Sequence, residues 1–362
     1  METRNEFVPF AIAHPGEILG EELKERGIKQ KDFAKQIGMQ PTHLNSLIKG
    51  KMDISEKIAC KLEAALGISF TDWMNLQANY HYYSRLIKAR GEEEGLAQQK
   101  ENRYNTLLNL KAIYTYFNIS WVEAHKRIQF IEENLEDLRK VMSCKLGYYK
   151  KSDACQIDER NLRTWLYIVN RQAKEVSIEY NYVEGNADRA AKQIATYANE
   201  GSLTIEVIKE TLNRNGILYL HVPKLPKTPV DAYSSKLYGR YTIVATYRYN
   251  DIDKLAFDII HELGHISLHI KNDNESFISM DEHILDAKER EANKYASEYL
   301  VPSHIWKQIM AGGTNSLNPY HIVDQIALRA REHHISPSIA VARYKRESNQ
   351  YRLSKYRSAK IT

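Results

Sequence analysis

Apolar residues in the first eighty positions recur at helical spacing, and glycines interrupt the pattern at short intervals. Ile18, Leu19 and Leu23, for example, lie on one face of a segment that Pro15 can open. The pattern predicts four short helices: one opened by Pro15, one marked by Phe33, Ala34 and Ile37, one over residues 41–48 and one over residues 54–66. Their ends are expected at Gly27, Gly38, Gly50 and Gly67, because glycine is the favoured residue just after a helix.

The remainder of the chain predicts more helices and two strands. Residues 91–105 are rich in Glu, Gln and Lys and indicate a solvated linker or an exposed helix. Further helices are expected at 107–117, 121–141, 162–177, 186–197, 204–213, 255–270, 286–300, 322–332 and 337–345. Two β-branched and aromatic runs, 217–222 and 241–249, predict strands. The fold class is therefore mainly α with a small β-sheet, an α+β arrangement.

Composition and charge place only weak limits on the partners and the cellular compartment of the protein. A formal net charge of +5 over 362 residues permits a nucleic-acid partner without requiring one. Cys60, Cys144 and Cys155 form no CxxC pair, so we expect no disulfide framework, as suits a reducing cytosol. No stretch has the length of a transmembrane helix. We expect a cytoplasmic protein with no membrane partner.

One apolar helix carries residues that fit metal chemistry. His261 and His265 are four residues apart within His-Glu-Leu-Gly-His, so both imidazoles can reach one ion from one helix face. Glu262 lies beside that face and can take a proton from a water at the metal. The pattern predicts a Zn2+ site with Glu262 as the catalytic base. His269 is too far along the axis to join both ligands and is expected to play an outer or packing role.

The third ligand is expected on the helix at 286–300. Glu289 and Glu291 are separated by about 200° around that helix, so only one of them can face the metal. We take Glu291 as the ligand because it borders the packing face, and we keep Glu289 as the alternative. The preceding strand, 241–249, is a candidate for pairing with an extended substrate backbone.

Three motifs in this order closely resemble the ImmA/IrrE family of metallo-endopeptidases. They are HELGHISLH, EREANKYASEYLVP and IALRAREHHISPSIAVARYKRE, within residues 158–347. Tyr295 stands where the family usually has Phe, and Tyr299 stands where it usually has Leu; neither change touches the metal. The resemblance implies a zincin-like metallopeptidase domain with zinc on His261, His265 and Glu291. It also implies that the substrate is a partner protein, often a transcriptional repressor, that is cut once.

The segment 29–50 predicts a helix-turn-helix. Leu44, Leu47 and Ile48 point into the core, which leaves the other side of the second helix free for DNA. The candidate DNA-binding residues are Gln30, Gln40, Thr42, His43, Asn45, Ser46 and Lys49. Lysines at 29, 31, 35, 49 and 51 make this side basic. The alternative is a helical module that binds protein.

This segment resembles the XRE, or lambda-repressor-like, family. His-Pro-Gly-Glu-Ile-Leu at 14–19 and Trp-Met-Asn-Leu-Gln-Ala-Asn-Tyr at 73–80 are similar to the HigA antitoxins in particular. The resemblance implies a double-stranded DNA operator, a homodimer and, for an antitoxin, a toxin partner. We expect a helix-turn-helix domain at 1–80, a helical middle region at 81–157, the peptidase domain at 158–347 and a basic tail at 348–362.

Three functions are compatible with these residues. The first is a transcriptional regulator with its own zinc endopeptidase. The second is a HigA-like antitoxin or repressor whose metallopeptidase domain acts only as a sensor or protein-binding module. The third is a relic without metal, which gives no physical reason for His261, Glu262 and His265 to occur together.

Overall fold

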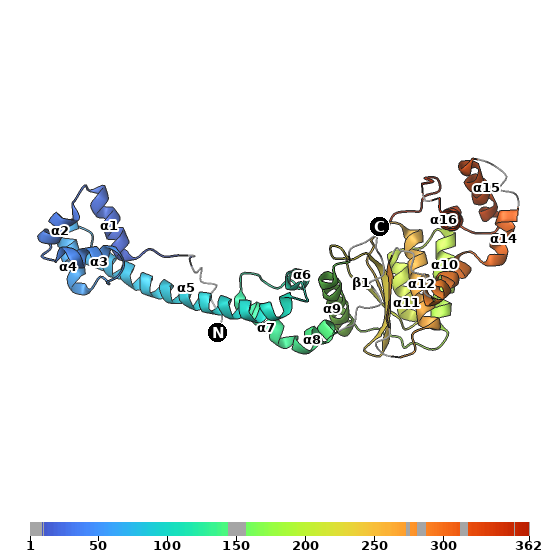
Figure 1. Cartoon of the computed structure of the whole chain (residues 1–362), viewed down its shortest axis with the longest axis horizontal. Coiled ribbons are helices and arrows are strands. Elements are labelled where there is room, and N and C mark those ends of the chain that lie inside the picture. Colours follow the sequence, from blue (N-terminus) through green and yellow to red (C-terminus); the bar gives the residue numbers. More distant parts are fainter. Residues whose placement is uncertain are drawn as a thin grey trace. The chain divides into compact units, whose positions relative to one another are not determined.

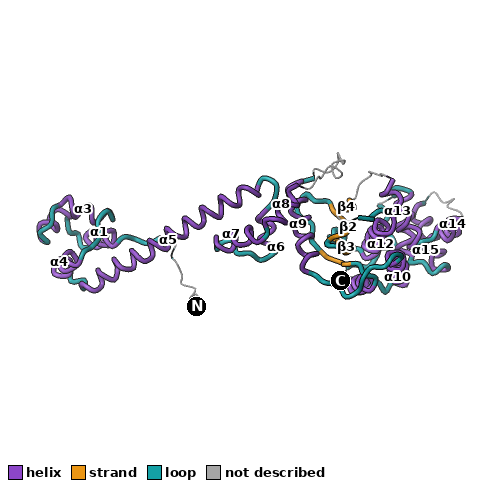
Figure 2. The backbone as a smooth tube through the Cα atoms, turned by 90° about the horizontal axis from the view of Figure 1, so that it is seen from below, coloured by secondary structure: helices purple, strands orange, loops and turns teal. Residues whose placement is uncertain are grey.

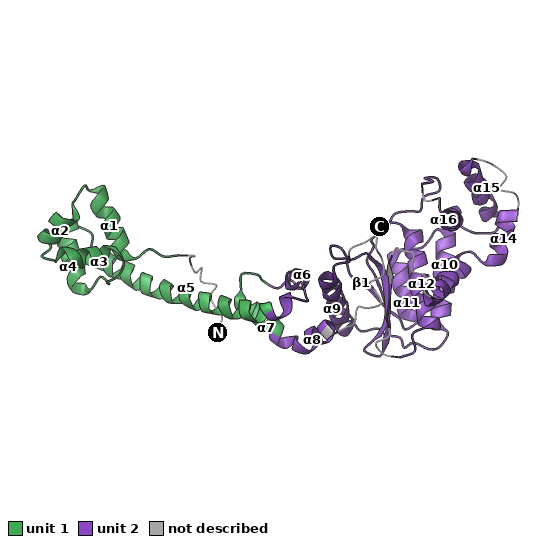
Figure 3. Ribbon diagram, viewed as in Figure 1, with its two compact units in different colours: residues 1–102, 120–131 green, residues 103–119, 132–362 purple. Residues whose placement is uncertain are grey.

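The computed structural model describes residue 9 and residues 11–143, 157–272, 276–280, 287–311, 318–350 and 352–361. Cys144 and Cys155 lie outside these ranges. The chain divides into two compact units, one of residues 1–102 and 120–131, the other of residues 103–119 and 132–362 (Figure 3). Residues of the expected middle region, 81–157, therefore contribute to both units. Along the described residues, no helix combines the length and the apolar character needed to cross a membrane.

The first unit has the four expected short helices followed by one long helix (Figure 1). They are α1 (Pro15–Glu25), α2 (Gln30–Gln36), α3 (Pro41–Ile48), α4 (Glu56–Leu66) and α5 (Phe70–Asn105). Leu19, Phe33, Leu44, Leu62 and Trp73 are fully buried and form its core. The helix ends agree with the glycine signals, since Gly27, Gly38, Gly50 and Gly67 all have positive φ.

The polar segment 91–105 is helical, as one of the two expectations for it required. It continues α5, and α7 (Ala124–Glu133) provides the contact that explains its buried Glu101. The side chain of Arg127 is only 3% exposed and pairs with Glu94 and, at 2.8 Å, with Glu101. A buried guanidinium needs such partners to offset its desolvation.

The second unit holds the remaining described elements. Its helices are α6 (Leu110–Tyr116), α8 (Leu135–Ser143), α9 (Glu159–Glu175), α10 (Asn186–Glu200), α11 (Ile205–Arg214), α12 (Ile252–Leu268), α13 (Ala287–Leu300), α14 (Ser303–Ala311), α15 (Pro319–Glu332) and α16 (Pro337–Glu347). The strands are β1 (Leu218–His221), β2 (Val230–Leu237), β3 (Arg240–Ala245) and β4 (Ser276–Met280). The sequence analysis missed α14, β2 and β4.

The strands form one sheet in the order β1-β3-β2-β4. β1 and β3 are parallel, while β2 runs antiparallel to both β3 and β4. β3 thus has neighbours on both sides. The prediction that the strand at 241–249 pairs with a substrate is wrong, because its backbone edges already bond to β1 and β2.

Helices cover both faces of the sheet (Figures 1 and 2). α9 packs on one face, where Trp165 meets Tyr233 of β2 edge to face at 5.8 Å between ring centroids. α12 lies against β2 and β3 on the other face, between the sheet and the helices α10 and α13. The main core fills this second layer and includes Ile259, Ile260 and Leu263 of α12, all fully buried. The motif helix is therefore the central helix of its unit.

Candidate functional site

α12 is held in place at its start and along its length. The Asp251 side chain caps it by accepting the backbone N–H of Lys254 at 2.9 Å. Gly264 lets α13 approach closely, since a Cβ there would lie 3.1 Å from Cδ1 of Tyr295. These contacts set the distance at which side chains of α13 meet the histidines of α12.

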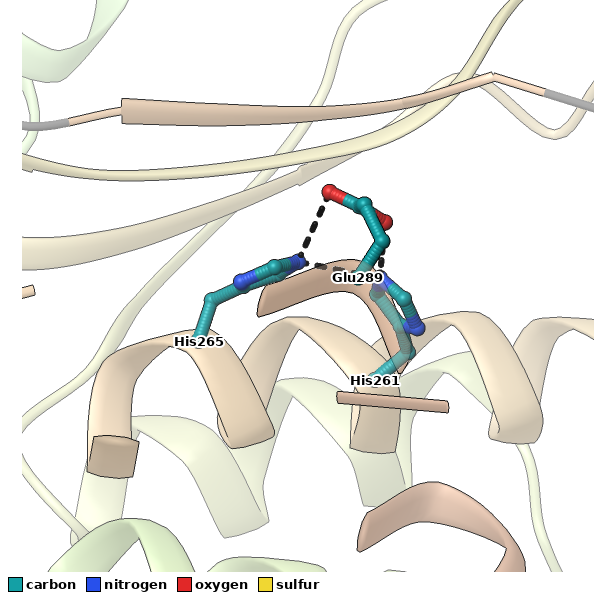
Figure 4. Close-up of side chains that lie close together, drawn as sticks. All are labelled: His261, His265 and Glu289. Carbon is teal, nitrogen blue, oxygen red and sulfur yellow. Dashed lines mark hydrogen bonds and ion pairs between the residues drawn. The ribbon is translucent and has the colours of Figure 1, made fainter. Parts of the chain in front are cut away.

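Two imidazoles and one carboxylate converge between α12 and α13 (Figure 4). The Nε2 atoms of His261 and His265 are 3.0 Å apart. Oε2 of Glu289 lies 3.1 Å from Nε2 of His261, and Oε1 lies 3.3 Å from Nε2 of His265. Within the described ranges, this is the group of His, Cys, Asp and Glu side chains with the spacing of a metal site.

The carboxylate in this cluster is that of Glu289, so the preference for Glu291 is corrected. Glu291 points to another partner, and its Oε2 lies 2.9 Å from Nε2 of His269. The two glutamates do face different directions, as the helix geometry required. Which one faces the histidines depends on how α13 is rotated against α12, and the packing face of α13 alone did not reveal this.

The ionisation of His265 and Glu289 suits metal binding. Burial lowers the pKa of His265 to about 4, which keeps this imidazole neutral. Burial acts in the same direction on His261, but its hydrogen bond to Glu289 and the charge of Glu262 outweigh it and raise the pKa. For Glu289, burial opposes ionisation, yet the hydrogen bonds to His261 and His265 lower its pKa to about 2. A neutral imidazole and an ionised carboxylate are the forms that coordinate a metal ion.

The donor set fits a zinc ion. Two imidazole nitrogens and one carboxylate oxygen form a common catalytic zinc donor set, and zinc–nitrogen bonds of about 2 Å place tetrahedral ligands roughly 3.3 Å apart. The observed separations of 3.0 to 3.3 Å are close to this value. The Nε2 atoms of both buried rings point at the same place, and in the metal-binding form each offers a lone pair there. A cation at this point satisfies both lone pairs.

Further contacts orient these side chains, and sequence reasoning missed three of them. The amide oxygen Oδ1 of Asn293, on α13, lies 3.1 Å from Nδ1 of His261. Ser234 of β2 donates to Oε2 of Glu262, which is fully buried. Phe277 of β4 stacks on His265, with ring centroids 4.1 Å apart and an interplanar angle of 8°. Asn293 lies four residues after Glu289, and this spacing was the one available signal.

In the first unit, the predicted DNA-binding residues are exposed or half-buried. Leu44 and Leu47 of α3 are fully buried, which turns the opposite face of that helix outward. On it, Gln40, Thr42, His43, Asn45 and Lys49 are exposed and Ser46 is half-buried; Gln30, at the start of α2, is exposed as well. Pro41 is the first helical residue of α3, as expected, and Gln40 makes no side-chain cap.

Comparisons with known proteins agree with both units. Residues 19–73 match the helix-turn-helix family, and residues 218–345 match the family described as the IrrE N-terminal-like domain, a peptidase M78 family. Over 63 residues the chain is 33% identical to the uncharacterized HTH-type transcriptional regulator YddM of Escherichia coli K12, covering 17% of this chain and 67% of that protein. It is also 34% identical over 68 residues to virulence-associated protein I of Dichelobacter nodosus, covering 18% of this chain and 63% of that protein.

Among solved structures, a putative antidote protein of a plasmid maintenance system from Nostoc punctiforme is similar at 29% identity. The match covers 24% of this chain and 93% of that one, with a TM-score of 0.23. All three relatives correspond to a small part of the present chain. The family matches indicate a helix-turn-helix of DNA-binding type and a domain of a metallopeptidase-like family.

Proposed function

We propose that this chain is a DNA-binding regulator that carries a zinc-dependent endopeptidase. Its residues 19–73 match the helix-turn-helix family, and its residues 218–345 match the IrrE N-terminal-like family. The observation that carries the proposal is the convergence of His261, His265 and Glu289 beside Glu262. Such a buried cluster has no value for folding alone, because desolvating it costs free energy that a metal ion would return.

The residues around this cluster have separate tasks in peptide hydrolysis. A zinc ion held there would polarise the substrate carbonyl and acidify a water molecule. Glu262 follows His261 directly on α12, and the Ser234 hydroxyl holds one of its carboxylate oxygens. Glu262 takes a proton from the attacking water and delivers it to the leaving amine.

The sheet offers a place for an extended substrate at β4, not at β3. β4 is the end strand of the sheet and pairs with β2. Its Phe277 lies on the ring of His265, so a peptide that pairs with β4 passes close to the metal ligands. We infer that the substrate is a regulatory partner protein, such as a repressor, cut at one extended segment.

The test of the peptidase compares Glu262→Gln with the wild type. We expect the variant to keep its zinc and its folding transition and to lose cleavage, because Gln cannot accept the proton. New protein N-termini would be mapped in cells that express either form. Glu332→Gln, an exposed residue on α15, is the matched control and should cleave normally. Identical new N-termini with wild type and Glu262→Gln would refute the mechanism.

The helix-turn-helix is proposed to bind a double-stranded operator as a homodimer, with α3 in the major groove. Asn45→Ala is expected to weaken binding and relax sequence preference. Lys49→Ala should weaken binding to all sequences and reduce the slope of log affinity against log salt by about 1. Lys57→Ala, on the exposed face of α4, is the control for charge. Gel shifts at several salt concentrations measure both effects, and no change would remove these residues from the DNA surface.

A regulator whose C-terminal unit is only a sensor or protein-binding module gives a different set of results. It would bind its operator and its toxin partner with full affinity, and Glu262→Gln would have no effect on any regulated gene. An enzyme that cleaves its partner predicts that the same substitution changes transcription.

A further inference from the structure

A relay of three hydrogen-bonded side chains, His265, His269 and Glu291, leads outward from the metal-ligand cluster. Nδ1 of His265 lies 2.9 Å from Nδ1 of His269, and Nε2 of His269 lies 2.9 Å from Oε2 of Glu291. The His269 side chain is 5% exposed, whereas that of Glu291 is 61% exposed. This relay therefore connects the buried cluster to the Glu291 carboxylate at the surface.

The direction of these hydrogen bonds is fixed by the last member. An ionised carboxylate only accepts hydrogen bonds, so the proton of a neutral His269 ring must be on Nε2. Nδ1 of His269 is then an acceptor, and the facing Nδ1 of His265 must carry the proton of that ring. This leaves Nε2 of His265 with a free lone pair, on the side where His261 and Glu289 lie.

The reverse arrangement breaks two contacts at once. A proton on Nδ1 of His269 would leave its Nε2 lone pair facing the Glu291 carboxylate at 2.9 Å. It would also move the proton of His265 to Nε2, where that nitrogen could not bind a metal. Glu291 does not contact His265, yet through His269 it determines which nitrogen of His265 can bind a metal ion.

We propose that His269 and Glu291 are positioning residues that hold His265 in its metal-binding tautomer. The inference rests on the proposed function, because the ion concerned is the zinc of the same site. It gives Glu291 a role in that site without making it a ligand. Hydrogen-bond partners of metal-bound histidines commonly fix the ring orientation and tautomer in this way.

The other ligand histidine has a simpler partner. Among the described residues, the hydrogen-bond partner of Nδ1 of His261 is the neutral amide oxygen of Asn293, at 3.1 Å. An amide can rotate and offer either oxygen or nitrogen, so it selects the tautomer less strongly than a carboxylate does. Phe277 also stacks on the face of His265, which fixes the plane of that ring but not which of its nitrogens carries the proton. The relay therefore determines the tautomer of His265, which packing leaves open.

The experiment measures zinc affinity by chelator competition in the full-length protein. His269→Phe keeps a ring of similar size but removes the acceptor, and zinc affinity should fall about 10- to 100-fold. His269→Asn places an amide oxygen where Nδ1 was and can therefore still accept from Nδ1 of His265, so it should restore affinity close to wild type. Glu291→Gln should show a loss at the lower end of the range, about 10-fold. His304→Phe and Glu332→Gln, both at exposed positions, are matched controls.

Histidine nitrogen NMR spectra read the tautomer directly. In the zinc-loaded wild type, His265 should carry its proton on Nδ1 and His269 on Nε2. Wild-type affinity in His269→Phe, or equal losses in His269→Phe and His269→Asn, would overturn the proposal, since the second result indicates packing alone. Should His269→Phe fail to fold, His269→Asn and the surface variant Glu291→Gln still decide the matter.

The outcomes separate this inference from the peptidase itself. If the variants change zinc affinity as expected but the wild type cleaves no protein, the relay is supported and the peptidase is refuted. If the wild type cleaves its partner and binds zinc, but no variant alters the affinity, only the relay is overturned. Absence of zinc binding in the wild type after reconstitution would overturn both.

Discussion

The buried carboxylate of Asp258 should make the stability of the second unit depend on pH in an uncommon direction. Asp258 lies on α12, one turn before Glu262, and the residue is 9% exposed. Nζ of Lys254 contacts its Oδ1 at 2.6 Å. Burial outweighs this ion pair and raises the pKa of Asp258 from 3.8 to about 6. The short distance alone would have indicated a lowered pKa, but the carboxylate loses more hydration than one lysine returns.

The size of the effect follows from the two pKa values. Because the folded chain binds this proton more tightly than the unfolded chain, the stabilisation is complete below pH 3.8 and is lost as the pH rises through about 6. A shift of about two pKa units corresponds to about 3 kcal/mol. Asp258→Asn cannot ionise. Its free energy of unfolding, relative to that of the wild type, should therefore increase by about 3 kcal/mol between pH 3.5 and pH 8.

Urea unfolding at a series of pH values, with a chelator present, measures this difference for the second unit. Comparing the variant with the wild type removes the pH dependence of all other groups. Asp324→Asn is the control of opposite sign, because hydrogen bonds to Lys355 and Tyr356 lower the pKa of Asp324. The stability provided by Asp324 should be lost as the pH falls. A difference for Asp258→Asn that is constant with pH, or that grows as the pH falls, would refute the reasoning.

Substitutions at three glycines give further predictions. Gly264→Ala places a Cβ 3.1 Å from Cδ1 of Tyr295, so α13 must shift by a few tenths of an ångström, and zinc affinity by chelator competition should decrease. Unchanged affinity would show that α13 yields freely. Gly16→Ala places a Cβ 1.7 Å from the carbonyl oxygen of Leu47 and should destabilise the first unit by about 1–3 kcal/mol or more, with loss of operator binding. Gly91→Ala, whose Cβ meets nothing within 4 Å on the helix α5, should instead stabilise by about 0.5–1 kcal/mol. Calorimetry distinguishes these two, and equal effects would contradict both.

Local signals in the sequence were sufficient for most of the helices and for part of the site. Glycines at helix ends predicted the order of α1 to α4, because the positive φ they permit is a property of the residue itself. His261 and His265 were predicted as a pair because they lie on one helix, where a spacing of four residues fixes their relative position. No knowledge of the remaining fold was needed for either.

Strands were harder, since their polar residues are buried by the fold and not by their own pattern. β2 reads Val-Asp-Ala-Tyr-Ser-Ser-Lys-Leu, without the alternation that predicts a half-buried strand. It is nevertheless buried on both faces, because α9 and α12 cover them. The same tertiary contacts bring Ser234 to Glu262, 28 residues apart in the chain.

The choice between Glu289 and Glu291 shows most clearly what the sequence determines and what the tertiary structure decides. The sequence by itself determined that only one of them could face the histidines, because helical geometry separates them by about 200°. Which one does so depends on the rotation of α13 against α12, and that rotation is set by contacts between the two helices, such as Tyr295 against Gly264. Only the tertiary structure therefore placed Glu289 beside His261 and His265 and turned Glu291 toward His269.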